Sequence, residues 1–262
     1  MREAQSHRGI DRITARPGRC CYGMGLGIII LDDVYPGFPG DVRNATSYSY
    51  NVQFEIVQGV DIQRLVFSKD KSPCLDPILQ AALNLEKKGC RAISAECGYF
   101  AYFQKEIAAE LRVPVFMSSL LQVPWAQQVI SPQQVVGIFV GSRQAVSSEH
   151  LSAVGIRPDS NYVIEGAVDD GVCKEFENLW IEGLRPETPR AVYSKAEEEF
   201  LRVGTAFYNS HPNMGAMVLE CTGFPPFARA LQREIDIPVF SYSTLLDYAY
   251  SVAVHRDFYG HV

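Results

Sequence analysis

The sequence lacks any long apolar segment. Its longest apolar run, Gly25 to Leu31, is much shorter than the roughly 20 residues that a membrane-spanning helix needs. The first nineteen residues hold five arginines but no apolar stretch ahead of a cleavage site, so they do not resemble a secretory signal peptide. We therefore expect a soluble protein that does not bind a membrane, with residues 1–22 as a loosely ordered N-terminal extension.

Patterns typical of disulfide-rich proteins, metal sites and nucleotide sites are also missing. Seven cysteines, an odd number without a CxxC pair, do not describe a disulfide framework, which favours a reducing, cytoplasmic setting. The five histidines show no metal-ligand spacing. The glycines from Gly23 to Gly27 precede a predicted strand, whereas a nucleotide-binding glycine motif follows one. We expect neither a metal nor a cofactor.

Positive charge is in the minority. The 24 Lys and Arg residues are scattered and are outnumbered by 30 Asp and Glu, which gives a net charge of -6. A surface that binds nucleic acid concentrates basic residues, so we exclude nucleic acid as a partner. With 47% apolar and 21% charged residues, the composition is that of an ordinary globular protein.

An internal repeat organises the chain. The Glu-Cys dipeptide that ends at Cys97 recurs at Cys221, an offset of 221 - 97 = 124. The same offset, without a gap, aligns residues 93–121 with residues 217–245 and gives ten identities in 29 positions. Self-similarity of this kind indicates a duplicated structural unit.

Each copy has the pattern of a β-α-β unit. A short apolar run predicts a buried parallel strand, apolar residues at i, i+4 and i+8 predict a helix, and a Pro-Val-Phe segment begins the next strand. The other predicted elements are strands at 25–31 and 135–140 and amphipathic helices at 75–88 and 195–209.

The predicted fold is therefore α/β, with two similar pseudo-symmetric lobes, each a mostly parallel sheet flanked by helices. We place the first lobe at residues 23–131 and the second at residues 132–243, so that each contains one of the repeated cysteines. A C-terminal helix within residues 244–262 is predicted to return and pack on the first lobe.

The two repeated cysteines are the candidate catalytic residues. Each follows a predicted parallel strand, and ligands of parallel sheets bind beyond the carboxyl ends of the strands. Lobes related by a two-fold axis would place Cys97 and Cys221 on opposite sides of one cleft, as an acid and a base. Each cysteine also precedes a predicted helix, whose N-terminus would lower the thiol pKa. Glu96 and Glu220 would raise that pKa, or have no effect if they point away.

These motifs resemble those of the aspartate/glutamate racemase superfamily, whose members carry two cysteines at equivalent positions of two similar α/β lobes and need no cofactor. The resemblance runs from about Gly25 to the C-terminus. It is most specific toward the branch that contains the algal dimethylsulfoniopropionate lyases, on residues 31–41, 96–104, 114–120 and 219–227. The resemblance implies paired thiol roles for Cys97 and Cys221, and we expect a homo-oligomer, a dimer or tetramer.

The residues that follow each cysteine differ from those of true glutamate racemases. Those enzymes have Asn-Thr after the first cysteine and Thr-His after the second, and of these only Thr222 is present here. This difference weakens the case for recognition of a free α-amino acid. Residues beside the cysteines or just after predicted strands are the candidate substrate-binding residues: Asp32, Tyr35, Gly98, Tyr99, Ser118, Ser119, Thr222, Gly223 and Tyr242.

Our leading hypothesis is a cofactor-independent enzyme, without pyridoxal phosphate, in which the two cysteines form and reprotonate a carbanion next to a carboxylate. The expected reaction is racemisation or epimerisation of a small (amino) acid. The alternative is a lyase in which the same carbanion expels a sulfide from dimethylsulfoniopropionate or a similar carboxylate. Decarboxylation and cis–trans isomerisation rank behind both. A non-catalytic carboxylate-binding protein is disfavoured because both cysteines are present.

Overall fold

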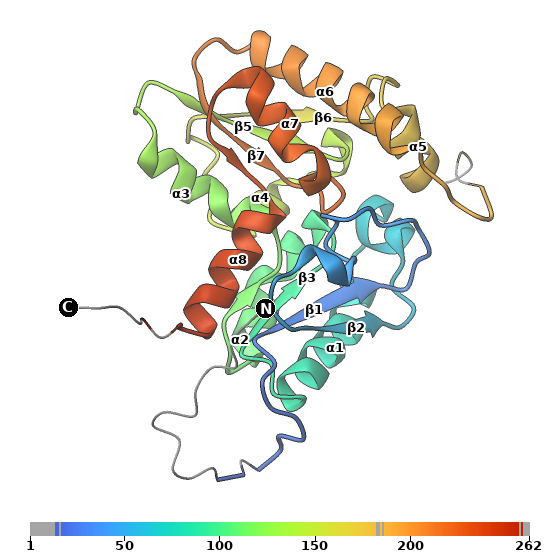
Figure 1. Cartoon of the computed structure of the whole chain (residues 1–262), viewed down its shortest axis with the longest axis vertical. Helices are drawn as coiled ribbons and strands as arrows, with labels where there is room; N and C mark the ends of the chain where they lie inside the picture. The colour runs from blue at the N-terminus through green and yellow to red at the C-terminus, as the bar shows by residue number, and fades with distance from the viewer. Residues whose placement is uncertain (1–13, 16, 182–183, 185, 257, 259–262) are drawn as a thin grey trace.

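The computed structural model describes residues 14–15, 17–181, 184, 186–256 and 258. Two four-stranded sheets form its centre, and all of their strand pairs are parallel. Helices flank each sheet, so the predicted α/β fold with two similar lobes is confirmed (Figure 1).

Residues 1–13 and 16 of the predicted N-terminal extension lie outside the described residues. Every helix in the described part of the chain is too short or too polar to span a bilayer.

The first sheet has the strand order β2-β1-β3-β4. Its strands are β1 (Leu26–Leu31), β2 (Val52–Val57), β3 (Ala92–Ala95) and β4 (Val115–Phe116). Side chains alternate along β1, so that Ile29 packs with the cluster that includes Ile78 and Ile107. Those two residues belong to the helices that cover this face, α1 (Leu75–Lys87) and α2 (Gln104–Glu110).

The second sheet has the equivalent order, β6-β5-β7-β8. Its strands are β5 (Val135–Val140), β6 (Tyr162–Gly166), β7 (Met214–Leu219) and β8 (Val239–Phe240). Buried aromatic residues, among them Phe139 and Phe200, join one face of this sheet to its helices. Those helices are α5 (Lys174–Trp180), α6 (Tyr193–Asn209) and α7 (Pro225–Ile235).

The two lobes exchange their last helices. Helix α8 (Tyr242–Ala253) follows the second sheet, but its Leu246 and Ala249 pack in one cluster with Leu26 of the first sheet. Conversely, α3 (Gln122–Val129) follows the first sheet, but its Val123 packs against the second sheet. Helix α4 (Ser148–Ala153) covers the same face of the second sheet. Figure 1 shows α8 between the two lobes. Through this exchange of helices, the carboxyl ends of the strands of one sheet lie close to those of the other.

Short helical turns make up the remaining regular structure. They lie in the loops that follow the strands, and the one that starts directly after Cys97 carries part of the pocket described below. The turns are η1 (Ala45–Ser47), η2 (Gln63–Phe67), η3 (Ser72–Cys74), η4 (Gly98–Phe103), η5 (Ser119–Leu121) and η6 (Arg143–Ala145).

Candidate active site

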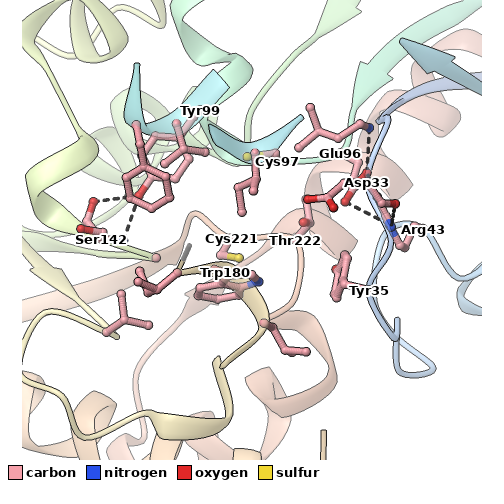
Figure 2. Close-up of a pocket in the computed structure, with 18 residues that line it drawn as sticks. Asp33, Tyr35, Arg43, Glu96, Cys97, Tyr99, Ser142, Trp180, Cys221 and Thr222 are labelled. Atoms are coloured by element: carbon pink, nitrogen blue, oxygen red, sulfur yellow. Dashed lines mark hydrogen bonds and ion pairs between the residues drawn. The ribbon is translucent and has the colours of Figure 1, made fainter. Parts of the chain in front are cut away.

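Cys97 and Cys221 lie in the walls of one pocket between the lobes. Each stands two positions after the end of its strand, Cys97 after β3 and Cys221 after β7. Figure 2 shows Cys97 entering from the first lobe and Cys221 from the second.

Each thiol meets a backbone N–H group two residues further along the chain. The Gly223 N–H donates to Cys221 Sγ at 3.5 Å, and the Tyr99 N–H donates to the thiol of Cys97. Nevertheless burial raises the pKa of both thiols well above the ordinary value, and the neighbouring Glu220 carboxylate raises it further.

The expectation that helix N-termini lower these pKa values is therefore wrong. Cys97 precedes only the six-residue 3-10 turn η4, and Cys221 stands four positions ahead of Pro225, the first residue of α7. The influence of a helix dipole falls off within about one turn. Burial thus outweighs any favourable contribution from the helix ends.

Cys97 also has an unusual backbone conformation. Its φ is 93° and its ψ is 119°, and among the described residues other than glycine only Asp236 also has a positive φ. Such a conformation costs a residue with a Cβ atom on the order of 1–3 kcal/mol. Cys221 has no such strain, so the two cysteines are equivalent in sequence but not in backbone.

An arginine and several carboxylates form one end of the pocket. The Arg43 guanidinium donates to both carboxylate oxygens of Glu96, at 3.1 and 2.8 Å, and to the Asp33 carbonyl at 2.9 Å (Figure 2). It also lies 4.5 Å from the centre of the Tyr35 ring. The Tyr35 hydroxyl donates to Asp41, and burial raises the pKa of the Asp41 carboxyl to about 7.

Aromatic and aliphatic side chains form the rest of the wall. The Tyr99 hydroxyl donates to the Ser142 carbonyl at 2.7 Å and accepts from the Ser142 N–H at 2.8 Å, which ties η4 to the loop after β5. The Trp180 ring stacks on Phe176 with centroids 4.7 Å apart. Apolar side chains complete the lining: Leu31, Ile62, Val66, Phe67, Val168, Leu179 and Ile181.

Three predicted substrate-binding residues line the pocket together with the cysteines: Tyr35, Tyr99 and Thr222. Two others lie beside it in supporting positions. Gly98 leaves room for Glu220, since a Cβ atom at this position would stand 2.0 Å from Glu220 Oε1. Gly223 contributes its backbone N–H to Cys221.

Four predicted residues do not line the pocket, and three of them connect structural elements. The Asp32 carboxylate accepts the Gly59 N–H at 3.2 Å. The Ser119 hydroxyl donates to the Leu219 carbonyl at 2.5 Å, and the Tyr242 hydroxyl donates to the Met117 carbonyl at 3.1 Å. Ser118 is fully buried next to Tyr242, and its side chain accepts the Leu120 N–H at 3.2 Å.

The pocket also contains residues that are absent from the predicted set. Gly141 and Ser142 follow β5 as Asp32 and Asp33 follow β1, so the strand-end rule could have found them. Arg43 and Trp180 come from segments outside the repeat, and no motif marks them. Among the described residues, no group of three or more His, Cys, Asp or Glu is placed to hold a metal ion.

Comparison with known proteins places the chain near two groups. It is 27% identical over 221 residues to a dimethylsulfoniopropionate lyase of Durusdinium sp. clade D, covering 82% of this chain and 70% of that enzyme. It is 26% identical to dimethylsulfoniopropionate lyase 3 of Emiliania huxleyi, covering 82% of this chain but only 56% of the Emiliania enzyme. No family model matches the chain.

Solved structures show the same fold at low sequence identity. A glutamate racemase from Bacillus anthracis has a TM-score of 0.55 and 11% identity, covering 88% of this chain and 80% of the racemase. Unliganded arylmalonate decarboxylase has a TM-score of 0.54 and 12% identity, covering 88% and 94%. The similarity to both groups confirms the resemblance that the motifs indicate.

Proposed function

Because the chain has the fold of the aspartate/glutamate racemase superfamily and a sequence similar to dimethylsulfoniopropionate lyases, we propose that it is a cofactor-independent carbon–sulfur lyase. Its substrate class is a small carboxylate with a β-sulfonium group. The observation that carries this proposal is the pocket in which Cys97 and Cys221 meet beside aromatic rings and carboxylates. Racemisation, the leading hypothesis from the sequence, is the second candidate because the two thiols come from opposite lobes.

The charge and shape of the pocket support a cationic substrate. An aromatic face such as that of Trp180 attracts cations, and sulfonium methyl groups can pack against it. The carboxylates of Asp33 and Glu96 outnumber the single guanidinium of Arg43 in the lining. An amino acid would need a polar partner for its ammonium group as well, while most of the remaining wall is apolar.

The proposed reaction is a β-elimination. One of the two cysteines, as a thiolate, removes the proton from the carbon next to the carboxylate, which forms an S–H bond and leaves an electron pair on that carbon. The other cysteine stays protonated and donates a hydrogen bond to the carboxylate, onto which part of that negative charge spreads. The electron pair becomes the C=C bond while the bond between the β-carbon and sulfur breaks, and the sulfur departs as a neutral sulfide. From dimethylsulfoniopropionate the products are acrylate, dimethyl sulfide and the proton on cysteine. The Thr222 hydroxyl is our candidate to hold the carboxylate.

The direct test is to incubate the purified protein with dimethylsulfoniopropionate in deuterated water. We expect acrylate signals in the proton NMR spectrum and dimethyl sulfide by gas chromatography. Positioned acid–base groups contribute about 10²–10⁴-fold, so Cys97→Ser and Cys221→Ser should each lower turnover by at least about 100-fold. Cys20→Ser is the matched control, because Cys20 is an exposed cysteine outside the pocket, and it should keep wild-type turnover.

Two outcomes would contradict the proposal. Solvent deuterium entering a chiral carboxylate with inversion, without release of a sulfide, would identify a racemase. Near wild-type release of sulfide by either pocket-cysteine variant would reject the two-thiol scheme.

The lobe boundaries, the homo-oligomer and the cytoplasmic location also remain proposals. The two-lobed fold and the composition are consistent with them. Light scattering measures the oligomeric state, and cell fractionation measures the location.

A further inference from the structure

Glu96 and Glu220 are equivalent residues of the repeat with the same backbone contacts. Each directly precedes a cysteine, and each donates its own N–H to the neighbouring strand, at Ile29 and Phe139 respectively. The Glu96 carboxylate accepts the Leu31 N–H at 3.2 Å, and the Glu220 carboxylate accepts the Gly141 N–H at 3.1 Å. A difference between the surroundings of the two carboxylates must therefore come from residues outside the repeat.

The two glutamates differ in what contacts the second oxygen of each carboxylate. Glu96 forms an ion pair with Arg43 at 2.8 Å, and the guanidinium binds both of its oxygens. Glu220 is only 1% exposed, and its Oε1 has no hydrogen-bond partner among the residues that the structure describes. In the described part of the chain, no cation pairs with Glu220. A buried carboxylate without a counter-ion favours its neutral, protonated form.

Glu220 is next to Cys221 in sequence and acts on Cys97 as well. Its Oε1 lies against the backbone of Gly98, the residue after Cys97, where a Cβ atom would stand only 2.0 Å away. The titratable groups that its charge affects come from three elements and are all neutral when protonated: Cys97, Tyr99, Cys221 and Tyr242. The charge of Lys71 also acts on Cys97, but backbone carbonyls of Leu65, Val66 and Ser68 hold its ammonium group. The carboxylates of Glu96 and Asp41 add smaller effects that raise the pKa of Cys97 and of Cys221 respectively.

We propose that Glu220 sets the charge of the cysteine pair: in its protonated form it permits a thiolate to form, and in its ionised form it opposes one. Glu220 does not line the pocket, so it acts through the thiols as a positioning residue. Two negative charges that act on each other in a buried site repel strongly, so the site holds one of them at a time. Burial raises the pKa of the Glu220 carboxyl to about 8, although the hydrogen bond from the Gly141 N–H lowers it. The change between the protonated and the ionised form of Glu220 therefore falls near neutral pH.

This inference rests on the proposed function only for its use in catalysis, because the charge of the thiols can be measured without a substrate. The experiment is alkylation of the wild type and of Glu220→Gln with iodoacetamide over a range of pH, followed by mass spectrometry of the Cys97 and Cys221 peptides. Removal of the carboxylate should raise the alkylation rate at pH 9 on the order of tenfold, a fall of about one unit in apparent thiol pKa. Glu220→Asp restores a titratable carboxyl and should restore the wild-type profile.

Glu177→Gln is the matched control. Glu177 is also a buried glutamate with an unpartnered oxygen, but it lies on α5 and does not line the cysteine pocket. Its removal should leave the alkylation profile unchanged. The buried Cys74, Cys90 and Cys173 report on unfolding, since they should stay unmodified in every variant.

A second measurement uses the wild type alone, in case Glu220→Gln does not fold. Carbon-13 labelling of glutamate carboxyl groups should show a glutamate that titrates near pH 8. Burial also raises the pKa of Glu96, so the signal of Glu220 is the one whose titration does not change in Arg43→Gln, which removes the ion pair of Glu96. The proposal is overturned if Glu220→Gln alkylates like the wild type, or if every glutamate titrates below pH 6. A protein that shows the switch but releases no sulfide would contradict the proposed function alone.

Discussion

At the scale of single residues, the duplicated cysteines differ in backbone strain. Cys97 has a φ of 93°, a region that glycine adopts readily and that a Cβ atom disfavours, while Cys221 is outside this region. The segment that follows explains the difference, because η4 begins directly at Gly98 whereas α7 begins only at Pro225. The first cysteine must therefore turn the chain more sharply than the second.

This strain predicts that glycine and alanine have opposite effects at the two positions. Cys97→Gly should be more stable than Cys97→Ala by about 1 kcal/mol, because alanine keeps the Cβ atom in the disfavoured region. At Cys221 the order should reverse, and Cys221→Ala should be more stable than Cys221→Gly by about 0.5–1 kcal/mol, since glycine there only adds freedom to the unfolded chain. Urea unfolding of the four variants measures both differences. A Cys97→Ala variant at least as stable as Cys97→Gly would show that Cys97 is not strained.

The glutamates show what the repeat could not reveal. The sequence makes Glu96 and Glu220 look identical, and it left open whether either would affect its cysteine. The answer depends on Arg43, which comes from the loop between β1 and β2, where no repeat or motif indicates a contact with Glu96. Pairing between residues 53 positions apart is a property of the folded chain.

At the scale of elements, apolar patterns predicted the central strands and the edge strands β4 and β8, but not the edge strands β2 and β6. The prediction for β3 (Ala92–Ala95) agrees with the structure because all four residues are buried. β2 and β6 were missed because they lie at the sheet edges, where partial burial allows polar residues such as Glu55 and Glu165. The effect of the helix ends was predicted wrongly, because apolar spacing does not show where a helix makes its first turn.

Helix α8 should contribute to the stability of the first lobe although it follows the second. Leu246 is 1% exposed and packs in the cluster that contains Leu26 and Ile28. Leu246→Ala should therefore lower the free energy of unfolding by about 2–5 kcal/mol. Ser243→Ala, on an exposed position of the same helix, should change it by less than about 0.5 kcal/mol. Chemical unfolding measures both, and a small loss for Leu246→Ala would show that α8 does not belong to the core.

At the scale of the whole molecule, the pocket depends on both lobes. Cys97 and Tyr99 come from the first lobe and Cys221 and Trp180 from the second, so a ligand in the pocket contacts both. The exchanged helices α3 and α8 connect the lobes as well, through the bond from Thr244 to Gln122 at 2.7 Å. We therefore expect the two lobes to unfold together and the ligand to stabilise the whole chain.

The last prediction concerns this coupling in the double variant Cys97→Ser/Cys221→Ser, which we expect to bind the proposed substrate without consuming it. At a concentration one hundredfold above its Kd, dimethylsulfoniopropionate should stabilise the protein by about 2.7 kcal/mol and raise Tm by roughly 5–10 °C. The analogue 3-(methylthio)propionate keeps the carboxylate, but its sulfur is neutral. It lacks the positive charge that Asp33, Glu96 and the aromatic rings would attract, so the same concentration should give a much smaller shift in Tm. Differential scanning calorimetry measures both shifts. Equal shifts would show that the pocket recognises the carboxylate alone, and two separate transitions would show that the lobes unfold independently.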